Sequence, residues 1–149
     1  MREKFTSDLK EAMKAGDKMR VATIRLIAAA LKDRDILARG EGKTVSDEDI
    51  LALLQKMIKS RQESLAIYET NNRPELAAQE KGEIEVISSY LPKQMDEAAV
   101  AAAIKAAIAE TGAASMKDMG KVVGALKAKY TGQMDFAKAS AAVKAALSS

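Results

Sequence analysis

The sequence contains no cysteine, no histidine and no tryptophan among its 149 residues. Without cysteine there is no disulfide, no thiolate nucleophile and no cysteine-ligated zinc or iron–sulfur centre. Without histidine the chain lacks the commonest general base and the commonest transition-metal ligand, and a Ser-His-Asp triad is excluded. We therefore expect neither a metal nor a cofactor.

Proline and aromatic residues are also scarce. The chain has 2 Pro and 3% aromatic residues against 48% hydrophobic residues, and 29 residues are Ala. Alanine is the strongest helix former, whereas strands are enriched in β-branched and aromatic residues. The composition therefore predicts an all-α fold, and the chain is long enough to bury a core without a metal or a disulfide.

Charges of the two signs nearly balance. Lys and Arg number 24 against 21 for Asp and Glu, a formal net charge of +3. This excess is compatible with a polyanionic partner but does not by itself identify one. The uncharged stretches fall short of the ~20 residues that span a membrane. Residues Met1–Phe5 carry mixed charge instead of the apolar core of a signal peptide. We expect a cytoplasmic protein that does not contact membranes.

Apolar periodicity and helix-ending residues predict seven helices in two domains. Four helices fall in residues 1–92, an expected N-terminal helical bundle that Pro92 closes. Composition changes at about Asp96, since 18 of the last 54 residues are Ala. Residues 96–149 are predicted to form a three-helix domain. The expected helices are 2–15, 18–39, 46–68, 74–91, 96–112, 115–132 and one beginning at 135.

Charged side chains interrupt the apolar stripes of the bundle helices. Glu80 lies in the stripe of the fourth expected helix, Arg61 in that of the third, and Arg25 at the margin of the second. Buried charges must be paired. We expect a structural ion pair, either Arg61 with Glu80 or Arg25 with Glu83, that fixes the register of the bundle. The alternative is a general acid–base carboxylate in a cleft, for which no second catalytic group is apparent.

Lysines and glycines cluster on the sixth expected helix. They are Lys117, Gly120, Lys121, Gly124, Lys127 and Lys129. A helical glycine costs about 1 kcal/mol relative to alanine but lets another surface approach the backbone. Two interpretations remain open. The glycines pack against a neighbouring helix while the lysines are merely solvated, or the lysines bind the phosphates of a folded RNA recognised by its backbone and shape.

Two segments carry a resemblance to a known family. Tyr90-Leu91-Pro92-Lys93-Gln94-Met95 precedes an Ala-rich helix, and Lys117-Asp118-Met119-Gly120-Lys121 follows it. With these segments the chain resembles the YqeY-like proteins. Their C-terminal module is shared with the tail of one subunit of the glutamine-dependent aspartyl/glutamyl-tRNA amidotransferase. The resemblance implies an all-helical protein whose tail-like domain resembles the part of that enzyme that contacts tRNA, while the enzyme's catalytic machinery lies in other domains.

From the lysine cluster and the resemblance together, the sequence predicts a non-catalytic, tRNA-associated helical adaptor. Its tail-like domain would contact the tRNA backbone through the lysines, with Gly120 and Gly124 allowing close approach, and a tRNA synthetase or an amidotransferase would be a further partner. Two alternatives remain. One is the family's glutamine-dependent carbon–nitrogen ligase activity on aminoacyl-tRNA, for which no catalytic site is evident; the other is a protein–protein interaction module.

Overall fold

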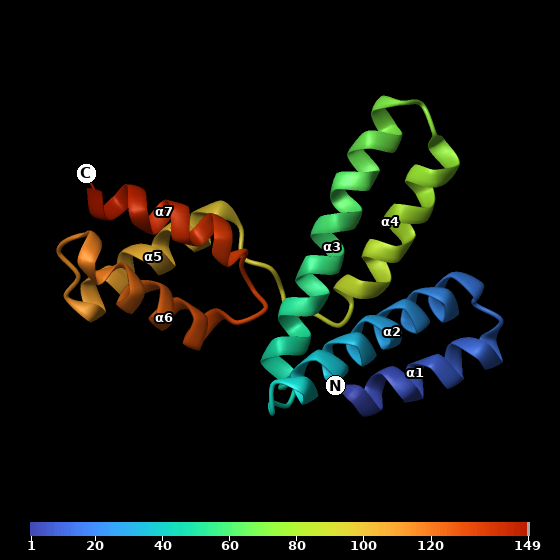
Figure 1. The fold of residues 1–149 in the computed structure, drawn as a ribbon. Helices are drawn as coiled ribbons and strands as arrows, with labels where there is room; N and C mark the ends of the chain where they lie inside the picture. The colour runs from blue at the N-terminus through green and yellow to red at the C-terminus, as the bar shows by residue number, and fades with distance from the viewer. Residues whose placement is uncertain (149) are drawn as a thin grey trace. The chain divides into compact units, whose positions relative to one another are not determined.

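A computed structural model describes residues 1–148 of the chain (Figure 1). Over these residues the chain forms seven α-helices and one 3-10 turn and contains no strand, so the all-α prediction is confirmed. The elements are α1 (Arg2–Ala15), α2 (Lys18–Gly40), α3 (Asp47–Thr70), α4 (Pro74–Ser88), α5 (Glu97–Thr111), η1 (Met116–Asp118), α6 (Met119–Tyr130) and α7 (Phe136–Ser148).

Contacts divide the chain into two compact units, Met1–Leu91 and a second that begins at Pro92. In the first unit, α3 and α4 form a helical hairpin and α1 runs back along α2 (Figure 1). These four helices bury one apolar cluster: Phe5, Ile24, Ile27, Leu31, Ile50, Leu54, Met57, Ile87 and Tyr90. The inward side of α2 therefore includes Ile24, Ile27 and Leu31, whereas Ala28 is exposed.

The ends of α1, α3 and α4 show why the chain folds locally as it does. Ser46 and Asp49 form a reciprocal capping box at the start of α3, with distances of 3.2 and 3.0 Å. Gly16 ends α1 in the left-handed conformation, at φ 71°. The helix α4 ends at Ser88, three residues before the predicted end, because the chain turns there and the Ser89 hydroxyl donates to the carbonyl of Val86.

The predicted ion pair has a different partner. The Arg61 Nε donates to the Glu83 Oε2 at 2.9 Å, and the guanidinium also donates to the Met57 carbonyl at 3.2 Å. The predicted pairings of Arg61 with Glu80 and of Arg25 with Glu83 are therefore wrong. The reason is the orientation of α4, which turns Glu83 into the core and leaves Glu80 only half-buried.

Helices α5, α6 and α7 enclose the core of the second unit. Ile104, Val122, Leu126 and Val143 lie at its centre and are almost fully buried. The segment that follows Pro92 is fastened to the connection between α6 and α7. Gln94 donates its side-chain amide to the Gly132 carbonyl at 2.6 Å, and the Met95 N–H donates to the Gln133 carbonyl at 2.9 Å. The start of this unit is thereby held to the residues that close its α6.

Candidate nucleic-acid interface

The lysine cluster begins on a 3-10 turn and continues on α6. The side chain of Ser115 makes no capping hydrogen bond, so the predicted α-helix from Ser115 begins instead with η1. The Asp118 Oδ2 accepts the Ala114 N–H at 3.0 Å. This backbone hydrogen bond, a second one from Ser115 and the nearby Lys121 charge lower the pKa of Asp118. Lys117 lies on this turn and not in the α-helix that carries the other members of the cluster, which differs from the predicted single helix.

The two sides of α6 differ sharply. Val122 and Leu126 are fully buried in the core of the unit. Gly120 and Gly124 are exposed, and a Cβ atom added to either would meet no atom within 4 Å. Neither glycine therefore packs against a neighbouring helix of the described chain. The backbone of α6 is instead open to solvent at two positions one turn apart.

The four candidate lysines do not share one environment. Lys117, Lys121 and Lys127 are exposed, and the Lys121 Nζ lies 4.0 Å from the Asp118 carboxylate. Lys129 instead reaches α5, where its Nζ lies 3.1 Å from both carboxylate oxygens of Glu110. Exposed ion pairs of this kind contribute about 0–1 kcal/mol. Lys117, Lys121 and Lys127 thus remain exposed, with Lys121 at 4.0 Å from Asp118, whereas Lys129 is bound closely to Glu110.

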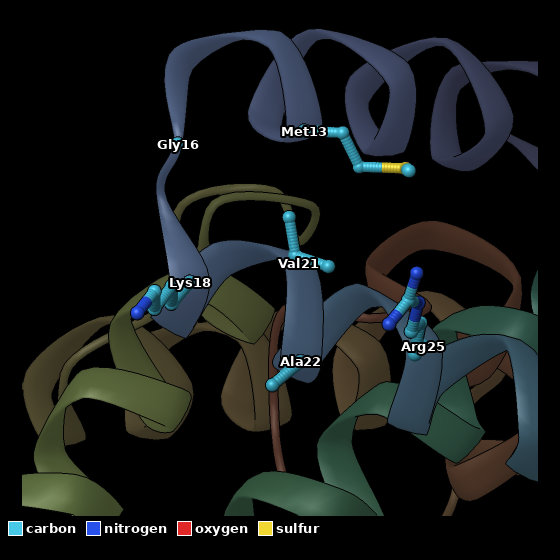
Figure 2. Close-up of a pocket in the computed structure, with 6 residues that line it drawn as sticks. All are labelled: Met13, Gly16, Lys18, Val21, Ala22 and Arg25. Carbon is cyan, nitrogen blue, oxygen red and sulfur yellow. The ribbon is translucent and has the colours of Figure 1, made fainter.

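A second surface feature lies in the first unit and escaped prediction. A groove of about 370 Å³ opens where α1 turns into α2. Figure 2 shows Met13 extending from α1, with Val21 below it on α2 and Arg25 one turn further on. Arg25, expected to pair with Glu83, is exposed and lines this groove. Met13 is 55% exposed at this groove.

The described residues were also considered as metal ligands and as membrane spans. Within residues 1–148, no group of three or more His, Cys, Asp or Glu side chains could hold a metal ion. In the same range no single helix is long and apolar enough to cross a membrane. The pair formed by α5 and residues 116–130 has the length and composition of a membrane span, but it is bent by 99°.

Comparisons with known proteins identify a family and several relatives of the chain. The sequence profile described as Yqey-like protein matches residues 2–147. The relatives are named "Altered inheritance of mitochondria protein 41, mitochondrial". The proteins of Saccharomyces cerevisiae and Lachancea thermotolerans are 33% and 38% identical over 84 residues, and that of Vanderwaltozyma polyspora is 36% identical over 85.

Each of these matches covers 56% of this chain and 44% of the relative, so the chain spans less than half the length of the curated relatives it matches. Their names are those of mitochondrial proteins, which contradicts the cytoplasmic location expected from the sequence. That expectation, which rested on the short uncharged stretches and on the mixed charge of residues 1–5, is therefore wrong.

Proposed function

The chain belongs to the Yqey-like protein family, and on that premise we propose that it is a non-catalytic helical adaptor that binds tRNA through the outward face of α6. Gly120 and Gly124 form the centre of the contact surface, and Lys117, Lys121 and Lys127 supply its cations. A tRNA synthetase or an amidotransferase is the proposed protein partner. In place of the cytoplasm we propose the mitochondrial setting that the relatives' names give for those proteins.

The observation that carries this proposal is the open backbone of α6 between exposed lysines. Most contacts to a nucleic-acid backbone come from Lys and Arg side chains and from backbone groups that approach the phosphates closely. A glycine without a neighbour within 4 Å permits that approach, and the ammonium groups of Lys121 and Lys127 flank it. The arrangement suits phosphates held along one helix face.

The aromatic residues near the lysines indicate which kind of RNA this surface would bind. Tyr130 and Phe136 are the nearby aromatic residues in the sequence, and both are half-buried in the cluster of this unit. They are poorly placed to stack successive bases, which is how single strands are usually bound. A folded RNA recognised by its shape and backbone is the better fit.

The test is binding of total tRNA to the full chain at about 50 mM and about 200 mM salt. Three phosphate contacts, each with a salt slope of about −0.7 to −0.9, predict an affinity about 20- to 40-fold lower at the higher concentration. Lys121→Glu is expected to weaken binding at low salt. Lys10→Glu replaces an exposed lysine on α1, changes the net charge by the same amount and is the matched control. Binding that is absent at low salt, or that both variants weaken alike, contradicts the proposal.

The absence of catalysis is tested separately, because the family is associated with glutamine-dependent carbon–nitrogen ligase activity. The purified chain is incubated with glutamine and misacylated tRNA, and release of ammonia and formation of the amidated product are followed. We expect a rate equal to that of the buffer control. A higher rate that Lys121→Glu abolishes would make the same surface part of an enzyme.

A further inference from the structure

Positive charge in this protein is concentrated on α2. The helix carries six basic and two acidic residues, a net charge of +4, whereas the whole chain carries +3. By contrast, α4 carries four Glu and one Lys, a net charge of −3. The nearly neutral total therefore hides one strongly basic helix in the first unit, far along the sequence from the lysines of α6.

The exposed side of α2 has a regular pattern, which we call the basic stripe. A basic residue occurs at every seventh position. Four positions after each of the first three basic residues there is an alanine or an isoleucine. The members are Lys18, Ala22, Arg25, Ala29, Lys32, Ile36 and Arg39, and all of them are exposed. The opposite side of α2 is buried through Ile24, Ile27 and Leu31, so the basic stripe faces away from the core of its unit.

Few carboxylates oppose these cations. Asp33 and Asp35 are the acidic residues of α2. Asp35 accepts two hydrogen bonds from Arg2, at 2.9 and 2.7 Å, and within the stripe its charge also interacts with Arg39. Asp33 lies beside Lys32 at the edge of the stripe. The groove of about 370 Å³ at the N-terminal end of the stripe is lined by Lys18, Arg25 and apolar atoms and by no carboxylate.

Exposed apolar side chains accompany the charges. Met13 at the groove is 55% exposed and Ile36 near the other end is 57% exposed. Ala22 and Ala29 between them leave room for a close approach. Exposed apolar side chains contribute nothing to phosphate binding, and a membrane surface needs a broad apolar face. The alternation of small or apolar residues with cations instead fits a protein surface of the same pattern and opposite charge.

The spacing identifies the shape of that surface. Alternating steps of four and three residues average 3.5, the period at which one α-helix stays in register with another along a shared seam. We propose that the basic stripe of α2, together with the groove beside Met13, binds an acidic amphipathic helix of a partner protein. Glutamates or aspartates of the partner helix pair with Arg25 and Lys32, and its apolar residues lie over Ala22, Ala29 and Ile36.

The experiment uses the full chain and a fluorescein-labelled synthetic helix of about four heptads, with Glu at one heptad position and Leu four residues later. Fluorescence anisotropy measures the affinity. Arg25→Glu is expected to weaken binding by about tenfold. Arg34→Glu makes the same charge change on another side of the same helix and is expected to change it by less than about twofold. Circular dichroism melting curves verify that both variants are folded.

A second experiment reverses the charges on both the peptide and the chain, and tests whether binding depends on specific charge pairs. A peptide with Lys in place of Glu is expected to bind the double variant Arg25→Glu/Lys32→Glu better than the unmodified chain. A peptide of the same composition with its glutamates spread around the helix is expected to bind weakly. Equal binding of the ordered and the spread peptides overturns the proposal, because it reduces the effect to net charge.

The same variants distinguish this occupant from RNA, a membrane or a second copy of the chain in separate binding measurements. If tRNA binding falls as much with Arg25→Glu as with Lys121→Glu, the stripe binds RNA and the proposal is overturned. The same holds if vesicles of anionic phospholipid bind the chain and Arg25→Glu abolishes that binding, or if the chain forms dimers that this variant dissociates. Loss of tRNA binding with Lys121→Glu alone leaves this proposal intact, so the two proposals fail independently.

Discussion

The phenol of Tyr90 donates a hydrogen bond of 2.6 Å to the carboxylate of Asp8, which lies 82 residues earlier in the chain. The Tyr90 ring packs edge-on against Phe5, with ring centroids 4.8 Å apart. Arg20 of α2 lies 3.6 Å from the same Asp8 carboxylate. One side chain at the end of the first unit therefore holds α1 in place, which gives the Tyr-Leu-Pro segment a structural role.

This contact predicts a specific loss of stability in alkali. Burial, and then the Asp8 carboxylate, raise the pKa of Tyr90 to about 12 from its usual 10.0. Because the pKa is higher in the folded state, its stabilising effect is fully present below pH 10 and is lost as the pH rises from 10 to 12. Chemical denaturation at several pH values should show a steeper fall of unfolding free energy for the unmodified chain than for Tyr90→Phe.

At neutral pH, Tyr90→Phe is expected to cost about 1.5 kcal/mol, since it removes a hydrogen bond to a charged group. Tyr68→Phe is the matched control, because Tyr68 is half-buried on α3 and outside this cluster. Identical slopes for the unmodified chain and Tyr90→Phe between pH 10 and 12 would contradict the assignment of the effect to Tyr90.

Two glutamates on α4, three residues apart, should respond to the same substitution with opposite sign. Glu83 is 8% exposed and bonded to Arg61, so Glu83→Gln is expected to destabilise the fold by about 2 kcal/mol. Glu80 has a raised pKa because of burial and then the Glu83 charge. A raised pKa means that the charged form is disfavoured in the folded state, so Glu80→Gln should stabilise slightly at pH 7. Thermal melts at pH 7 measure both changes.

The pH dependence separates the two causes. The gain from Glu80→Gln should vanish as the pH falls below the usual value of 4.5, where the unmodified Glu80 is itself protonated in both states. A destabilising Glu80→Gln at pH 7 would mean that Glu80 has a favourable ionic partner after all.

Gly124→Ala should separate the stability of α6 from its proposed role. The added Cβ meets no atom within 4 Å, so the variant is expected to gain about 1 kcal/mol of stability from helix propensity. If tRNA phosphates approach the backbone at this position, the same variant should bind tRNA several-fold more weakly. Gly40→Ala, equally open but at the end of α2, should leave binding unchanged. Stronger binding by Gly124→Ala would remove the need for close approach.

Glu110 is expected to keep Lys129, the fourth lysine of the predicted cluster, from joining the proposed interface. Its carboxylate holds Lys129 at 3.1 Å, and both side chains are 56% exposed. Glu110→Gln should raise the affinity for tRNA by about two- to threefold at low salt, and the gain should shrink as salt screens the charges. Stability should change by less than about 0.5 kcal/mol, because the pair is on the surface. Glu63→Gln, exposed on α3, is the control for charge alone.

Local sequence determined most of the helices. Alanine content, the Ser46–Asp49 capping box and the glycines that end helices act over a few residues, and for that reason the all-α prediction held. The turn at Ser89 and the 3-10 turn at Met116–Asp118 departed from prediction, because hydrogen bonds particular to those segments decide them.

Tertiary structure alone decided which charges meet. Periodicity placed both Arg61 and Glu80 on apolar stripes, but the orientation of α4 in the hairpin selected Glu83 as the partner. The same applies to Lys129, which packing turns toward Glu110, and to Arg25, which it leaves at a groove. A sequence specifies which side chains share a helix face, because that depends on local geometry. Which face meets which partner depends on contacts between residues far apart in the chain, as between Asp8 and Tyr90.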